Sequence, residues 1–130
     1  MDYKKSFDKL EKALVELQYE NKSTPIVVEG DKDIKALRKL DISGSIISVN
    51  AGVSLIDFCD KIAKEHSEVI ILTDWDRKGG NICRTIKKNL EGRVNCNTKY
   101  RELFAKNTMI RTLEGLPSWL ETMKNKLNLI

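Results

Sequence analysis

The chain is poor in cysteine and histidine, the residues that build disulfide frameworks and zinc sites. It contains three cysteines and one histidine among 130 residues, and Cys59, Cys83 and Cys96 show no C-x-x-C spacing. We therefore expect neither a disulfide framework nor a zinc site. Free thiols are typical of a reducing compartment, so we expect a cytoplasmic protein.

Long apolar runs are absent as well. No stretch reaches the ~18 apolar residues that span a membrane, and the first residues lead into a charged segment. These patterns predict no signal peptide and no membrane partner. The net charge is only +4, a mild excess that permits a polyanionic partner such as nucleic acid without requiring one.

Short apolar runs alternate with amphipathic segments along the chain. The spacing predicts helices over residues 6–19, 33–40, 80–90 and 100–105, after Ser54 and from residue 116 onward, and strands over 26–28, 46–49, 69–73 and 94–96. Such alternation predicts an α/β fold, a three-layer sandwich in which a mainly parallel sheet of about four strands has helices on both faces. The length suits a single domain over residues 1–130.

Two of the predicted strands end in carboxylates followed by glycine. Glu29 follows the strand 26–28, and Asp74 and Asp76 follow the strand 69–73. Because the carboxyl ends of parallel strands meet at one edge of the sheet, we expect these side chains to converge. Clustered carboxylates repel one another unless a cation lies between them, and oxygen ligands suit Mg²⁺ or Mn²⁺. The sequence therefore predicts a metal site.

Glycines and basic residues lie beside these acids. A helix that begins at Gly79 and Gly80 would present free N–H groups and the positive end of its dipole to a phosphate. The residues expected to bind phosphate or nucleic acid are Gly30, Lys32, Arg77, Lys78, Gly79 and Gly80. A metal, a helix N-terminus and cations together are typical of phosphoryl transfer.

Simpler roles remain open for the same acids. Asp and Gly dominate turns for ordinary conformational reasons, so Asp74 and Asp76 can belong to a turn that binds nothing. Asp33 can cap the helix that follows Glu29 or assist the metal site.

The two motifs together resemble those of the Toprim domain family. V-V-E-G-x-x-D at 27–33 and D-x-D-x-x-G at 74–79 each follow an apolar run. The resemblance covers a core of residues 24–96 and leaves an N-terminal helix and a C-terminal helical extension outside it. It implies that Glu29 acts as general acid or base and that Mg²⁺ is held by Asp74 and Asp76, with Glu29 and Asp33 as further ligands.

Within that family the motifs are closest in form to those of ribonuclease M5 and bacterial-type primases. Type IA topoisomerases carry a third acid where this chain has Lys78, and they need domains that do not fit in this length. The resemblance implies Mg²⁺- or Mn²⁺-dependent phosphotransfer on nucleic acid by a small nuclease, in RNA processing or DNA repair.

Two alternatives to a nuclease remain. One is a non-catalytic nucleic-acid-binding Toprim module, or a subunit of a replication, repair or RNA-processing complex, acting as a homodimer or in a larger assembly. The other is an enzyme for a phosphorylated small molecule or nucleotide.

Four further features bear on the site or on its partners. Trp75 is expected to pack under its turn, with base stacking as the alternative. Glu114 and Gly115 echo the first motif without a preceding strand, and we interpret the echo as chance. Residues 50–52 resemble a loop of small Toprim proteins. A loose basic patch, which is either a guide for nucleic acid or a solvated face, is expected from Lys87, Lys88, Arg93, Lys99 and Arg101.

Overall fold

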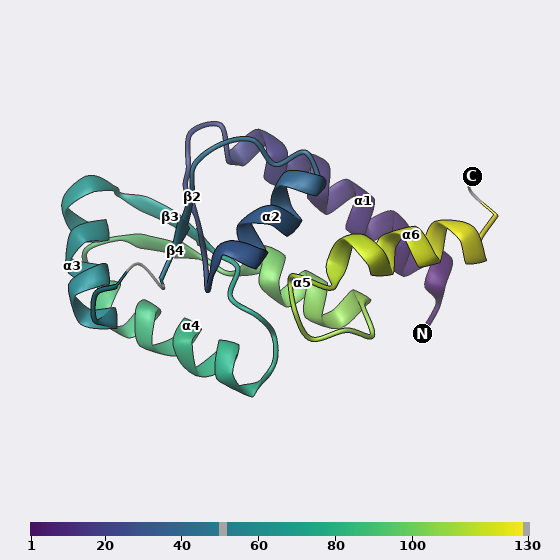
Figure 1. Cartoon of the computed structure of the whole chain (residues 1–130). Coiled ribbons are helices and arrows are strands. Elements are labelled where there is room, and N and C mark those ends of the chain that lie inside the picture. Colours follow the sequence, from purple (N-terminus) through teal and green to yellow (C-terminus); the bar gives the residue numbers. More distant parts are fainter. Residues whose placement is uncertain (50–51, 129–130) are drawn as a thin grey trace.

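The structure, a computed structural model, describes residues 1–49 and 52–128. This part of the chain contains six helices and four strands (Figure 1). The helices are α1 (Tyr3–Glu20), α2 (Asp31–Lys39), α3 (Leu55–Glu65), α4 (Arg77–Leu90), α5 (Lys99–Asn107) and α6 (Leu116–Lys126). The strands are β1 (Ile26–Val28), β2 (Ile46–Ser48), β3 (Glu68–Ile71) and β4 (Asn95–Asn97).

The four strands form one parallel sheet in the order β2-β1-β3-β4. The two central strands, β1 and β3, are the ones that precede the acidic motifs. In their register Val27 pairs with Ile71, so Glu29 and Asp74 leave the sheet at the same edge. The predicted α/β class with a parallel four-stranded sheet is confirmed.

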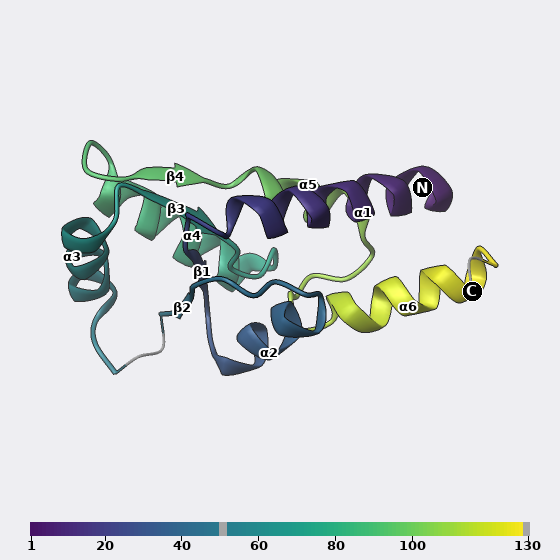
Figure 2. The same ribbon diagram turned by 90° about the horizontal axis from the view of Figure 1, so that it is seen from above.

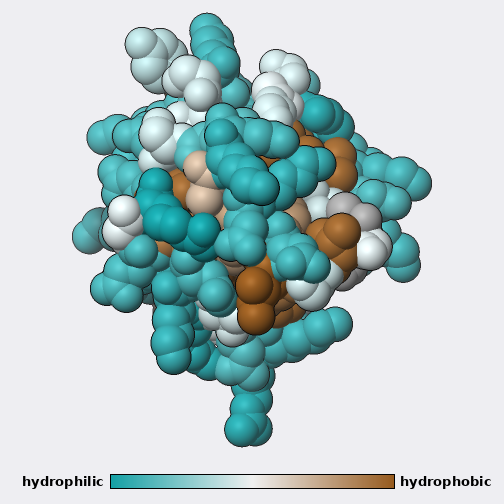
Figure 3. All heavy atoms as spheres, turned by 90° about the vertical axis from the view of Figure 1, so that its left-hand side faces the viewer, coloured by the Kyte–Doolittle hydropathy of each residue, from teal (hydrophilic) through white to brown (hydrophobic). Residues whose placement is uncertain are grey.

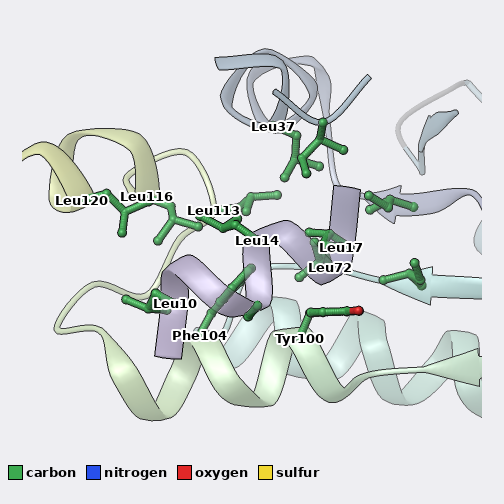
Figure 4. Close-up of a cluster of buried hydrophobic side chains, with 14 of the residues drawn as sticks. Leu10, Leu14, Leu17, Leu37, Leu72, Tyr100, Phe104, Leu113, Leu116 and Leu120 are labelled. Carbon is green, nitrogen blue, oxygen red and sulfur yellow. The ribbon is translucent and has the colours of Figure 1, made fainter. Parts of the chain in front are cut away.

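Helices cover both faces of the sheet because the side chains of the central strands alternate between two cores. Ile26 and Val28 point into a core shared with α1, α2, α5 and α6. Figure 4 shows side chains from these four helices in that core. Val27 points into a second core shared with α3 and α4. Figures 1 and 2 show α6 lying beside α1, away from α3 and α4. The α3 side of the molecule is largely hydrophilic (Figure 3).

Several local predictions are confirmed. Ser54 caps α3 by accepting the N–H of Asp57 at 3.1 Å. All three cysteines are free thiols. Trp75 packs against the first core, 5.9 Å from the Phe104 ring between centroids. Among the described residues, no helix is long and apolar enough to cross a membrane.

Several predicted boundaries differ from the structure by one to three residues. Helix α1 begins at Tyr3 rather than residue 6, and β3 ends at Ile71 rather than residue 73. Beside the acidic motifs, α2 begins at Asp31 rather than residue 33, and α4 begins at Arg77 rather than Gly80. These two helices start directly after their acidic turns, because Gly30 and Asp76 already occupy the cap positions. Residues 109–113 form neither helix nor strand. The predicted 50–52 loop lies largely outside the described residues.

A buried asparagine joins the end of α1 to the sheet. Asn21 is 2% exposed. Its amide donates to the carbonyls of Thr24 (3.0 Å) and Ser45 (2.9 Å), and its side-chain oxygen accepts the N–H of Gly44 at 2.7 Å. These bonds hold together the two loops that lead into β1 and β2.

We expect Asn21→Ala to lower the free energy of unfolding by about 2 kcal/mol, because it leaves buried backbone groups without partners. Urea unfolding measures the loss, and Ser23→Ala, at an exposed position two residues on, serves as the control with an expected change within about 0.5 kcal/mol. Equal stability of the two variants would contradict this role of Asn21.

Candidate metal and phosphate site

The structure brings the two acidic motifs together at the carboxyl edge of the sheet. Glu29 and Asp74 are separated by 45 positions, yet Glu29 Oε2 accepts the backbone N–H of Asp74 at 2.7 Å. The contact follows from the topology, because β1 and β3 are neighbours in the sheet. Glu29 is thereby oriented by the turn that carries the other two acids.

Asp76 has a structural role in addition to its predicted one. Its Oδ1 accepts the N–H of Gly79 at 2.7 Å and so caps α4, while its carbonyl accepts the N–H of Gly80 at 3.0 Å. The interpretation that Gly79 and Gly80 offer free N–H groups to a phosphate is therefore wrong in this structure. The first turn begins with Arg77 and Lys78, which are both exposed.

Asp33 fills the capping role that the sequence left open. It is 8% exposed, and its Oδ2 accepts the N–H of Gly30 at 3.1 Å, across the start of α2. Gly30 and Lys32 flank it in the same turn, where Lys32 is exposed and Gly30 half-buried. Asp33 is close enough to the other motif that the charge of Asp74 raises its pKa.

The four acids share one arrangement. One oxygen of each carboxylate accepts a backbone N–H. Glu29 accepts from Asp74 and Asp74 from Leu113. Asp76 accepts from Gly79 and Asp33 from Gly30. Burial raises the pKa of Asp33 and Asp74, whereas hydrogen bonding to the Glu29 backbone lowers that of Asp33 and hydrogen bonding to the Glu29 side chain lowers that of Asp74. Each carboxylate is therefore oriented by the backbone, and Glu29 links Asp33 and Asp74 into one group.

Burial and mutual repulsion act on the protonation of three of these groups. Desolvation raises the pKa of Glu29, Asp33 and Asp74, and it is the largest effect in each case. Neighbouring carboxylates raise these pKa values further, whereas the backbone hydrogen bonds lower them. Negative charge thus accumulates at this edge at a cost that a cation would relieve.

The donor set fits Mg²⁺ or Mn²⁺, because it consists of carboxylate oxygens alone. Among residues 1–49 and 52–128, however, no three acidic, histidine or cysteine side chains lie together in a metal-holding arrangement. Mg²⁺ usually binds one or two carboxylates and keeps several waters. The chemistry of the site therefore suits Mg²⁺ held by two of these acids. The predicted cluster of three or more metal-binding carboxylates is not present among the described residues.

The segment 108–115 between α5 and α6, here called the C-terminal segment, contributes residues that the sequence analysis did not place at the site. The N–H of Leu113 donates to Asp74 Oδ1 at 2.8 Å, and the N–H and indole Nε1 of Trp75 donate to the carbonyls of Arg111 (2.9 Å) and Ile110 (2.6 Å). Leu113 is fully buried in the first core, which anchors the segment (Figure 4).

This segment also brings Glu114 to the acids, since its charge raises the pKa of both Asp33 and Asp74. The Glu114–Gly115 pair follows an irregular segment and not a strand, so it is no second copy of the motif. Its interpretation as chance nevertheless overlooked a carboxylate that the tertiary structure places near the site.

The predicted basic patch divides into separate groups. Arg93 pairs with Asp60 at 3.1 Å, and Lys99 pairs with Glu20 at 3.3 Å. Arg101 instead reaches the D-x-D turn, where its guanidinium donates to the carbonyls of Thr73 (3.1 Å) and Asp74 (2.8 Å). No local pattern in the sequence distinguishes Arg101 from the other basic residues.

We expect Asp74→Asn to stabilise the metal-free protein at about pH 7. The pKa of Asp74 is raised in the folded state, so its ionisation costs folding free energy; the cost is complete above the raised pKa and absent below the ordinary value of 3.8. The amide still offers an oxygen to the N–H of Leu113. Thermal unfolding in a chelator measures the gain, which should shrink as the pH falls below the raised pKa and be gone below about 4.

Glu121→Gln, which neutralises an exposed acid on α6, is the control for a general change in net charge. An unfolding midpoint of Asp74→Asn below that of wild type at about pH 7 would show that the ionised Asp74 side chain does not destabilise the metal-free fold.

Comparison with known proteins gives a consistent result. The Toprim domain model matches residues 24–106. A UPF0292 protein of Thermoplasma volcanium is 41% identical over 106 residues, 78% of this chain and 86% of the relative. A UPF0292 protein of Methanosarcina acetivorans is 32% identical over 130 residues, covering 95% and 88%. A solved structure from Aquifex aeolicus aligns with a TM-score of 0.69 and 27% identity, over 80% of this chain and 94% of that one.

Proposed function

The chain belongs to the Toprim domain family, and from this premise we propose that it is a Mg²⁺- or Mn²⁺-dependent nuclease that hydrolyses phosphodiester bonds in nucleic acid. The observation that carries the proposal is the hydrogen bond from the Asp74 N–H to Glu29 Oε2. It fixes a carboxyl group of raised pKa beside the turn that carries Asp74 and Asp76.

Asp74 and Asp76 are the residues that would hold the metal, which supplies positive charge to the scissile phosphate. Glu29 is suited to hold or transfer a proton, because its raised pKa moves it toward neutral pH. The Asp74 N–H holds its Oε2 in place. Lys32, Arg77 and Lys78 are exposed cations of the two acidic turns and would bind phosphate oxygens.

A polymeric substrate fits this site better than a small nucleotide does. Asp76 is half-buried, while Arg77, Lys78 and Lys32 are exposed, so Asp76 and the cations of both turns can be reached from solvent. An open, positively flanked edge accommodates a continuous phosphate backbone. A small phosphorylated molecule would leave these flanking cations without a role.

The second candidate is a non-catalytic module that binds nucleic acid as part of a larger complex. It is favoured by the lack, in the described part of the chain, of three metal-binding side chains in one cluster. The same cations would serve it, and the acids would then set the orientation of the bound strand.

Cleavage of end-labelled RNA and DNA, single- and double-stranded, tests the proposal. We expect products with Mg²⁺ or Mn²⁺ and none with a chelator. Binding without cleavage under every condition would refute the nuclease and favour the module. Binding of free nucleotides, with no binding of either polymer, would refute both and indicate a small-molecule enzyme.

A further inference from the structure

Two arginine side chains from different helices meet beside the D-x-D turn. Arg84 lies on α4 and Arg101 on α5. A guanidinium nitrogen of each is 3.5 Å from the point where a side chain on Gly80 would begin, so the two nitrogens are at most about 7 Å apart. Neither arginine forms an ion pair with the described acids; Arg84 bonds to the Asn81 side chain, and Arg101 bonds to carbonyls.

Their approach places uncompensated positive charge in one place. Like charges at this separation repel each other, and an anion between them would attract both, so that the net electrostatic energy of the three charges becomes favourable. The positive charges of Arg101, Lys87 and Arg84 also act on the buried thiol of Cys83, where they oppose the rise in pKa that burial causes. The surface around the N-terminal half of α4 is thus cationic.

Gly80 is buried beneath the two guanidinium groups, which both approach the same point above its Cα. It lies inside α4, where alanine would favour the helix by up to about 1 kcal/mol. A methyl group there would make only ordinary contacts, at 3.5 Å from two flexible side chains. The backbone therefore does not require glycine at position 80, and the lack of a side chain lets both guanidinium groups approach one point, from which each can donate a charge-assisted hydrogen bond of about 2.8 Å to one phosphate group.

We propose that Arg84 and Arg101 form a phosphate subsite over Gly80, which binds a backbone phosphate of the nucleic acid beside the one at the acids. The proposal rests on the proposed function and deepens it. Arg101 connects the two positions, because it also bonds the carbonyl of Asp74 at 2.8 Å. Binding at the subsite thus positions the strand relative to Asp74 and Asp76, and it favours polymers over mononucleotides.

Fluorescence anisotropy with labelled RNA and DNA oligonucleotides, measured in a chelator so that cleavage is blocked, tests the subsite. We expect Arg84→Ala to weaken binding about tenfold and to reduce the salt slope by about one. Arg84→Lys should recover only part of this loss, because an ammonium group lacks the planar donor pair.

Gly80→Ala gives a readout that a structural role would not produce. We expect weaker oligonucleotide binding together with an unchanged or raised unfolding midpoint, since the methyl group would occupy the point that both guanidinium groups approach while favouring the helix. Lys12→Ala, which removes one charge from the exposed side of α1, across the sheet from α4, should change the affinity less than about twofold.

The outcomes separate the subsite from the proposed function. If the protein cleaves nucleic acid but Arg84→Ala and Gly80→Ala bind like wild type, the subsite is wrong and the nuclease stands. If Lys12→Ala weakens binding as much as Arg84→Ala, the attraction is diffuse and the subsite is again wrong. If wild type binds neither polymer, both proposals fail.

Discussion

Replacement of Asp76 by asparagine should abolish metal-dependent cleavage and leave the fold intact. The asparagine side chain still presents an oxygen to the Gly79 N–H, which Asp76 accepts at 2.7 Å, and asparagine is as good a helix cap as aspartate. What is lost is the negative charge that would hold the metal. We expect a fall in turnover of at least about 100-fold, as for loss of a group worth several kcal/mol in the transition state.

The same substitution logic applies to the other two acids. Glu29→Gln keeps an acceptor for the Asp74 N–H, and Asp74→Asn keeps one for the Leu113 N–H. Loss of a general acid or base costs about 10²- to 10⁴-fold, so Glu29→Gln should also change the pH dependence of the remaining activity. Each variant is compared by turnover, unfolding midpoint and stabilisation by Mg²⁺.

Two controls make the result specific. Asp8→Asn neutralises an exposed acid on α1 and should cleave like wild type. Asp76→Ala should lose activity like Asp76→Asn and, in addition, about 1 kcal/mol of stability, because the cap is gone. Turnover of Asp76→Asn equal to that of wild type would end the assignment of Asp76 to the metal.

The largest effect on stability is expected from Gly79→Ala. A methyl group on Gly79 would overlap the carbonyl group of Asp74 and lie 2.9 Å from its Cα, whereas carbon atoms in contact are about 3.5–4.0 Å apart. The atoms in the way are backbone atoms of Asp74, which cannot move aside by changing a side-chain rotamer. We expect a loss of about 3 kcal/mol, which corresponds to a fall of roughly 10 °C in the unfolding midpoint.

Gly80→Ala is the matched comparison at the next position. Its nearest neighbours are the ends of two flexible arginines at 3.5 Å, so its unfolding midpoint should be unchanged or higher. Urea and thermal unfolding of both variants check the pair. Similar stabilities for Gly79→Ala and Gly80→Ala would mean that the D-x-D turn does not pack against α4 as closely as the structure has it.

The fold class was predictable because its signals are local. The runs 26–28 and 69–73 are too short for helices and apolar at successive positions, as strands buried on both faces are. Ser54 was recognised as a cap from its place before an amphipathic segment. The start of α4 could have been predicted in the same way, because Asp76 is an equally good cap. The two glycines instead favoured a start at Gly80, three residues later than the observed start at Arg77.

The sequence by itself determined that two acidic turns follow apolar strands in an α/β chain, because strand patterns, caps and turns depend on residues within a few positions of one another. Only the tertiary structure decided that β1 and β3 are neighbours, so that Glu29 contacts the turn of Asp74. It also brought Leu113 and Arg101 to that turn. These contacts depend on how α5 and the C-terminal segment pack on the first core, a nonlocal burial of apolar surface that leaves no periodic pattern around the polar residues it positions.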